Sequence, residues 1–246
     1  MLKRLYDKSP LWFALAWIIT YCVLLSVADA VSMMLGTAKV LSFPVGLLLS
    51  LLLLFFLKKH GLLLTYGLCR SQTSARDVLY YLPLLLLLTA NLWYGVHVHL
   101  GTVETVLYIL TMLCVGFLEE VIFRGLLFFA LCKDNKRTAV IVSSVTFGFG
   151  HIINLINGSG AELLPNLMQV IYATAAGFMF VMLFCKTRSL VACIVTHGVF
   201  NALSVFSLGT RTALQTVLSC VLLTLITGTY AVYLAYSIHK EKSRSQ

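Results

Sequence analysis

Long apolar runs separated by short polar segments make up most of the chain. A helix that crosses a bilayer needs about 20 predominantly apolar residues. Eight stretches approach that length, and they cover residues 10–29, 40–57, 77–96, 104–132, 138–156, 163–185, 189–208 and 212–238. The pattern predicts an all-α fold, a membrane bundle of about eight transmembrane helices that forms a single integral membrane domain over residues 1–246.

The segments that join the predicted helices are short. The longest, KKHGLLLTYGLCRSQTSARD at residues 58–77, has room for a short helix on the membrane surface. HKEKSRSQ, residues 239–246, has the composition of a polar tail. Ala28-Asp29-Ala30 resembles a signal-peptidase site, but the apolar run before it is too long for a signal peptide and more spans follow. We therefore expect residues 10–29 to remain as the first helix.

Composition excludes a soluble domain. Hydrophobic residues make up 60% of the chain and charged residues 11%, whereas soluble domains are about half apolar and about a quarter charged. The seven cysteines include no C-x-x-C pair, and most lie inside apolar runs. We interpret them as small packing residues rather than as partners in disulfides or zinc sites.

Basic residues are distributed unevenly between the two sides of the predicted bundle. If the spans alternate in direction, fifteen of the eighteen Lys and Arg residues lie on the side of the N-terminus, and Lys39 and Arg211 lie on the other side. Cytoplasmic loops carry such an excess of Lys and Arg. The pattern predicts cytoplasmic N- and C-termini, and it accounts for the net charge of +9 without a nucleic-acid partner. The remaining basic residue is Arg124, inside the fourth span.

The stretch GFLEEVIFRG, residues 116–125, places Glu119, Glu120 and Arg124 in the middle of an apolar run. Ionisable groups at this depth are costly and are therefore functional candidates. Glu120 and Arg124 are four residues apart, so they share a helix face and can form an ion pair. Glu119 lies about 100° around the helix, which leaves its carboxylate for general acid or base chemistry.

Two later spans carry polar pairs at the same spacing. TFGFGH places Phe147 and His151 on one helix face, where the glycines of the motif let a neighbouring helix or a substrate backbone come close. THGVFN places His197 and Asn201 on one face. With a helical rise of about 1.5 Å per residue, these side chains and the glutamates reach overlapping depths. We predict a cluster made of Glu119, Glu120, Arg124, His151, His197 and Asn201.

Plainer interpretations exist for each of these residues taken alone. The Glu120–Arg124 pair could serve only to lock helices together. A single histidine or asparagine within a span often forms a hydrogen bond between helices, and Asn154 and Gln169 fit that interpretation. The combination of three polar pairs is what points to an active site.

The three pairs resemble the CAAX protease and bacteriocin-processing family of intramembrane proteases, also called the abortive-infection family. That family has E-E-x-x-x-R on one helix, F-x-x-x-H on the next, and H-x-x-x-N or D on a later one; the motifs start here at Glu119, Phe147 and His197. KTRSLVACIVTHGVFNAL, residues 186–203, also resembles the family's T-x-S-L run before the last histidine. The resemblance covers residues 104–208.

The resemblance implies hydrolysis of a peptide bond within the membrane, with residues 104–208 as the catalytic core. Glu119 and His151 would hold and activate a water, and His197 with Asn201 would stabilise the oxyanion. The Glu–Arg pair of the first motif would set the electrostatics around them, and Phe147 would have a supporting position.

Zinc is an alternative means of activating the water. Members of the family are often labelled metalloproteases, and Glu119, His151 and His197 could form a His₂Glu site with an open position for water. The chain has no H-E-x-x-H motif, and asparagine is a poor zinc ligand. We therefore favour a water activated by the glutamate without a metal.

The expected partners are membrane lipid and a peptide or protein substrate, bound through its C-terminal or membrane-proximal segment. The compact chain resembles prokaryotic members linked to bacteriocin maturation or immunity, so we expect a plasma-membrane location and no prenylated substrate. Two alternatives stay open. Buried Glu, Arg and His also mark the pathways of proton-coupled transporters, and the protein could be a non-catalytic immunity or scaffold protein.

Overall fold

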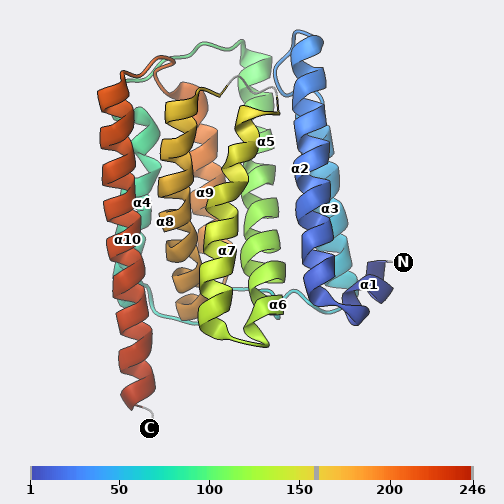
Figure 1. Cartoon of the computed structure of the whole chain (residues 1–246), viewed down its shortest axis with the longest axis vertical. Helices are drawn as coiled ribbons and strands as arrows, with labels where there is room; N and C mark the ends of the chain where they lie inside the picture. The colour runs from blue at the N-terminus through green and yellow to red at the C-terminus, as the bar shows by residue number, and fades with distance from the viewer. Residues whose placement is uncertain (1, 158–160, 245–246) are drawn as a thin grey trace.

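The structure, a computed structural model, describes residues 2–157 and 161–244. Helices run up and down beside one another in this part of the chain (Figure 1). They are α1 (Leu2–Lys8), α2 (Pro10–Met34), α3 (Ser42–Lys59), η1 (Ala75–Tyr81), α4 (Leu82–Leu88), η2 (Ala90–Leu92), α5 (Thr102–Glu119), η3 (Glu120–Leu127), α6 (Phe128–Cys132), α7 (Lys136–Gly150), η4 (His151–Leu155), α8 (Leu163–Thr187), α9 (Val191–Leu203), η5 (Ser204–Phe206) and α10 (Ala213–Arg244). The prediction of an all-α fold is confirmed.

Among the described residues, seven helical segments are long and apolar enough to cross a membrane. They are Pro10–Met34, Ser42–Lys59, Ala75–Leu92, Thr102–Cys132, Lys136–Leu155, Leu163–Thr187 and Ala213–Arg244. Each overlaps a predicted span. Large apolar side chains such as Trp12, Phe55 and Val232 are exposed, as expected for a surface that contacts lipid.

The predicted span at residues 189–208 is shorter than expected. Its helix occupies Val191–Phe206, below the length of the seven others. The chain enters it through Arg188 in a left-handed conformation (φ 55°), and the Val191 N–H donates a hydrogen bond to the Ser189 hydroxyl (3.2 Å). These local bonds fix a late helix start, so the prediction of eight full-length spans is wrong at this segment.

The predicted span at residues 77–96 is helical only in pieces. Leu79, Tyr80 and Tyr81 have positive φ angles and interrupt the helix between η1 and α4. Pro83 then lies in the first turn of α4, where its missing N–H costs no helical hydrogen bond.

Two polar segments differ from the expectation. Residues 60–74 form turns and extended chain instead of a surface helix. Gly61 and Gly67 permit these turns because their φ angles are positive (67° and 72°). The polar tail is not a separate segment, since α10 continues through it to Arg244, and residues 245–246 lie outside the described residues.

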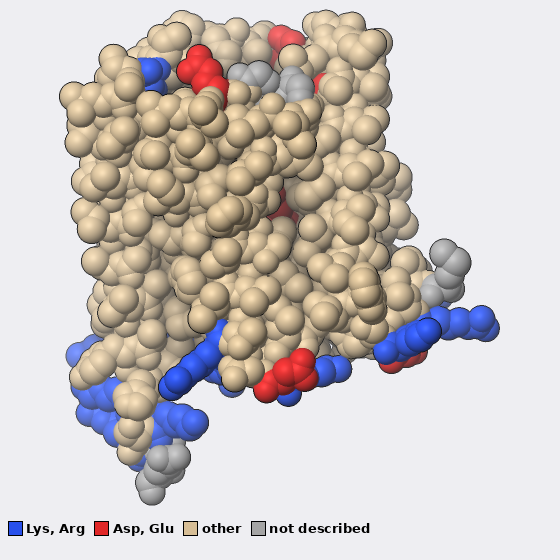
Figure 2. Space-filling view, viewed as in Figure 1, with Lys and Arg blue, Asp and Glu red and all other residues tan. Residues whose placement is uncertain are grey.

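Both ends of the described chain lie at the same end of the bundle (Figure 1). We call it the basic end, because Figure 2 shows most Lys and Arg side chains gathered there. It contains α1, the turns of residues 60–74 and the last turn of α10. The opposite end contains the turn between α2 and α3, with Lys39, and the segment before α10, with Arg211.

The helices that carry the predicted site pack closely on one another. α5 packs against α9, and α7 packs against α8. A Cβ atom at Gly116 would lie 2.5 Å from the Cα of Gly198, and one at Gly148 would lie 2.8 Å from the Cα of Thr174. Glycine is therefore required at both crossings, which confirms the expected close approach at Gly148. Gly150 has open space beside it and lines the cavity described below.

Candidate active site

Glu119 and Glu120 lie where the helix changes its winding. α5 ends at Glu119, and the next 8 residues, Glu120–Leu127, form the π-helical segment η3. π-helical turns are rare and occur frequently at functional sites. Every residue of η3 is buried, so this segment directs its polar side chains into the bundle rather than toward lipid.

Glu120 and Arg124 form a buried ion pair. Arg124 Nη1 lies 3.0 Å from Glu120 Oε1, and the exposure of both side chains is 0%. The guanidinium also lies over the ring of Phe147, 3.9 Å from the centroid, and 5.4 Å from the centroid of Phe180. The negative face of an aromatic ring attracts a cation. The predicted pairing is confirmed, and Phe147 supports it by direct contact with Arg124.

His197 of α9 contacts both glutamates. Its Nδ1 lies 2.8 Å from Glu120 Oε1, and its Nε2 lies 3.5 Å from Glu119 Oε2. Because an ionised carboxylate only accepts hydrogen bonds, we assign the ring N–H to Nδ1, which donates a hydrogen bond to Glu120. The ring is also in contact with Phe147 and Phe180, at centroid distances of 5.6 and 5.8 Å. His197 thus links the ion pair to the second carboxylate.

Glu119 is held from another side by Tyr21 of α2, whose hydroxyl donates a hydrogen bond to Glu119 Oε1. Sequence reasoning missed Tyr21, which lies in an apolar run; the tendency of a buried tyrosine hydroxyl to find a partner was the only signal. In the described part of the chain, Arg124 pairs with Glu120, and no Lys or Arg pairs with Glu119. This agrees with the predicted division between one neutralised carboxylate and one available carboxylate.

A cavity of about 370 Å³ reaches Glu119, and His151 and Asn201 line it as well. A second, smaller cavity of about 40 Å³ is lined by His151, His197 and Asn201. His151 and Asn201 therefore line both spaces, whereas Glu119 lines only the larger one and His197 only the smaller one. The buried ion pair lies beside them, in contact with His197. Figure 2 shows a hollow partway along the bundle with acidic atoms in its depth.

His151 directly follows α7 and begins the short 3₁₀ helix η4. Its ring is partly buried and lies edge-on to Phe147, with 5.4 Å between the ring centroids. Its backbone carbonyl accepts a hydrogen bond from Asn166 Nδ2 of α8 (2.8 Å), which fixes the end of α7 against α8. His151 and Glu119 share the cavity without a direct hydrogen bond among the described contacts.

Asn154 and Gln169 also border this cavity. Asn154 Nδ2 donates a hydrogen bond to Gln169 Oε1 (3.3 Å), which joins η4 to α8. Their interpretation as a hydrogen-bonded connection between helices is confirmed.

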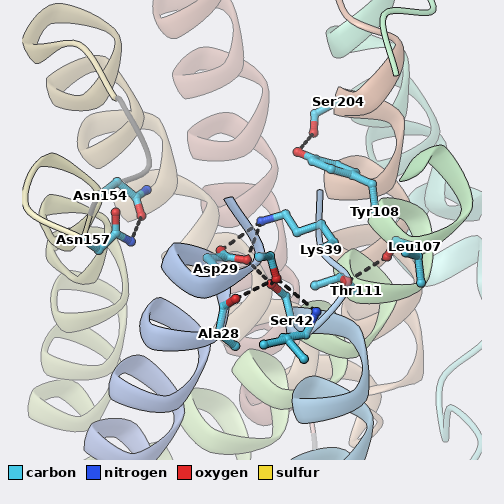
Figure 3. A network of polar contacts seen from close by, with 12 residues as sticks. Ala28, Asp29, Lys39, Ser42, Leu107, Tyr108, Thr111, Asn154, Asn157 and Ser204 are labelled. Atoms are coloured by element: carbon cyan, nitrogen blue, oxygen red, sulfur yellow. Dashed lines mark hydrogen bonds and ion pairs between the residues drawn. The ribbon is translucent and has the colours of Figure 1, made fainter. Parts of the chain in front are cut away.

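Polar contacts drawn in Figure 3 form a network that includes Asp29, Lys39, Tyr108 and Ser204, which line the cavity. Lys39 Nζ lies 2.9 Å from both carboxylate oxygens of Asp29, and the Ser42 hydroxyl donates a hydrogen bond to the same group. The hydroxyls of Tyr108 and Ser204 are 2.9 Å apart and join α5 to η5. Sequence reasoning missed this network, because charged residues at span ends usually face water and carry no further signal.

The described residues do not gather into a metal site. No group of three or more His, Cys, Asp or Glu side chains within residues 2–157 and 161–244 is arranged to hold a metal ion. This arrangement does not support Glu119, His151 and His197 as a ligand set for zinc, and activation of the water by zinc stays an alternative prediction. At His197, Nδ1 is engaged with Glu120 and Nε2 faces Glu119.

Comparison with known proteins agrees with the motif pattern. Residues 101–203 match the family model described as Rce1-like: Type II CAAX prenyl endopeptidase Rce1-like. The matched range contains α5, η3, α7, η4, α8 and α9, the helices that carry all six predicted site residues. Comparison with curated proteins gives no match, and comparison with solved structures gives none.

Proposed function

From the premise that residues 101–203 form an Rce1-like CAAX prenyl endopeptidase domain, a family of intramembrane proteases, we propose that this protein hydrolyses a peptide bond of a protein substrate with a water activated by Glu119. One observation carries the proposal. Of two adjacent buried carboxylates, Glu120 is paired with Arg124 (3.0 Å), whereas Glu119 faces a cavity and forms no ion pair with a Lys or Arg among the described residues.

In the proposed reaction, Glu119 accepts a proton from a water held between its carboxylate and His151. The resulting hydroxide attacks the carbonyl carbon of the scissile bond, and the carbonyl oxygen gains the negative charge. Asn201, which lines the cavity, would donate a hydrogen bond from Nδ2 to this oxygen, and one such donor contributes about 3–4 kcal/mol of transition-state stabilisation. The protonated Glu119 then returns its proton to the leaving amine as the carbon–nitrogen bond breaks.

His197 has a positioning role in this proposal. Its contacts with Glu120 (2.8 Å) and Glu119 (3.5 Å) support a task of orienting Glu119 rather than one in the oxyanion site. Glu120 and Arg124 set the charge of the surroundings, and Phe147 holds both Arg124 and the His197 ring. No step requires a metal, because Glu119 itself removes the proton.

We propose an integral membrane protein with both termini in the cytoplasm. Two observations support this orientation: both described ends lie at the basic end (Figure 1), and Lys and Arg are concentrated there (Figure 2), as cytoplasmic segments require. Asp29 and Lys39 border the catalytic cavity from the opposite end. The substrate would then be the C-terminal or membrane-proximal segment of a peptide or protein, as in bacteriocin maturation or immunity, and it would reach the site from outside the cytoplasm.

Cleavage by purified protein tests this proposal. The wild type in detergent is compared with Glu119→Ala, His151→Ala and His197→Ala on farnesylated and unmodified C-terminal peptides, with cleavage products measured by mass spectrometry. We expect cleavage by the wild type and a loss of at least a hundredfold in each variant. An absence of cleavage by folded wild-type protein, together with proton flux in reconstituted vesicles, would favour the transporter instead.

A further inference from the structure

A further cavity lies beside the cavity that reaches Glu119, toward the opposite end of the bundle. It has a volume of about 610 Å³, within the range of about 300–1,000 Å³ typical of ligand sites. Asn91, Gln169, Tyr172 and Phe200 line both cavities, so the two spaces lie side by side along these side chains. We call the larger one the vestibule. The mechanism above assigns it no role.

Arg211, which precedes α10, brings a positive charge into the vestibule. Its guanidinium lies 5.6 Å from the ring centroid of Tyr94, and its Nη2 donates a long hydrogen bond to the backbone carbonyl of Asn91 (3.5 Å). Glu162 lines the same vestibule, but it forms no ion pair with Arg211 among the described contacts. The guanidinium therefore keeps most of its hydrogen-bond donors available.

Lys39 provides the contrast at the same end of the bundle. Its ammonium group is paired with Asp29 at 2.9 Å, so its charge is already neutralised. A guanidinium presents a planar fork of N–H donors that matches both oxygens of a carboxylate. Arg211, the available cation in the vestibule, is thus of the type that best recognises a carboxylate.

We propose that Arg211 binds a carboxylate of the peptide substrate while the scissile bond lies beside Glu119. This inference rests on the proposed protease function for the nature of the ligand. Asn91 and Gln169 border both cavities. Asn91 Nδ2 donates to the Phe200 carbonyl and Gln169 Oε1 accepts from Asn154, so Asn91 Oδ1 would accept, and Gln169 Nε2 would donate, a hydrogen bond to the intervening peptide backbone. The carboxylate has two possible sources, the C-terminus of the peptide or an acidic side chain, and both present the same two oxygens.

Equilibrium binding of four labelled hexapeptides of one apolar sequence tests the inference. One ends in a free carboxylate, one in an amide, and two more are amidated and carry Asp or Asn at one internal position. Each is measured against the wild type, Arg211→Gln, Arg211→Lys and the control Arg76→Gln, which removes the same charge from an exposed position at the basic end.

We expect the wild type to bind at least one carboxylate peptide about tenfold or more tightly than its neutral match, since hydrogen bonds to charged groups are strong. Preference for the free C-terminus or for Asp identifies the source of the carboxylate. Arg211→Gln should abolish the preference, Arg211→Lys should retain part of it, and Arg76→Gln should keep it in full. Equal binding of acidic and neutral peptides by the wild type, or an unchanged preference in Arg211→Gln, overturns the inference.

The same peptides separate the two proposals. Cleavage of all four at equal rates would support the protease function and overturn the proposal that Arg211 binds a carboxylate. A carboxylate preference that depends on Arg211, without cleavage of any peptide, would support the binding site and overturn the protease function.

Discussion

Replacement of Arg124 by methionine would leave Glu120 as a buried charge without its cation. The pair is fully buried at 3.0 Å, and at an effective dielectric constant of about 20 the attraction between two unit charges at this distance is about 5–6 kcal/mol. Breaking a buried pair by removing one partner typically costs about 3–5 kcal/mol, because the remaining charge is uncompensated. For a chain of this size, that loss corresponds to a decrease in Tm of about 6–20 °C.

Thermal unfolding in detergent, followed by circular dichroism, measures this loss. Lys3→Met is a suitable control, because it breaks an exposed pair with Asp7 that contributes at most about 1 kcal/mol. The double variant Glu120→Gln/Arg124→Met removes both charges and should recover at least half of the loss. Equal Tm values for Arg124→Met and Lys3→Met, or a double variant as unstable as Arg124→Met, would show that the uncompensated charge of Glu120 is not what destabilises the protein.

Further predictions concern the contacts around the site and its orientation. Tyr21→Phe removes the hydroxyl that donates to Glu119 and should lower the free energy of unfolding by about 1.5–3 kcal/mol, whereas Tyr236→Phe, at an exposed position, should not change it measurably. Gly116→Ala forces a Cβ atom against the backbone of α9 and should cost about 1–3 kcal/mol; Gly228→Ala, with open space beside it, should be neutral or slightly stabilising. Treatment with a chelator should leave cleavage by the purified protein unchanged, and restoration of lost activity by added zinc would contradict the metal-free reaction. Right-side-out membrane vesicles should cleave an added impermeant peptide, and cleavage only by inside-out vesicles would reverse the proposed orientation.

Helical spacing predicted those parts of the site that depend on a single helix. Glu120 and Arg124 pair as a separation of four residues requires, even though the helix there is π-helical. The apolar runs likewise located the seven long helices. The shortened helix after Arg188 was not predictable from hydropathy, because its start depends on a left-handed residue and a local hydrogen bond to Ser189.

Contacts between helices could not be predicted from the sequence. The helical rise predicted that His197 lies at the level of the glutamates, but the direction of its two ring nitrogens depends on the crossing of α5 and α9 at two glycines. The sequence alone also does not identify Tyr21 or Arg211 as site residues, since the proposed role of each depends on a cavity formed by several helices.

The cleavage rate of Glu119→Gln shows whether Glu119 activates the water. The amide keeps the size of the side chain and removes its ability to accept the proton. We expect the cleavage rate to decrease by about 10²–10⁴-fold, with peptide binding retained and Tm within a few degrees of the wild type. Cleavage by folded Glu119→Gln protein at a rate within tenfold of the wild type would contradict it.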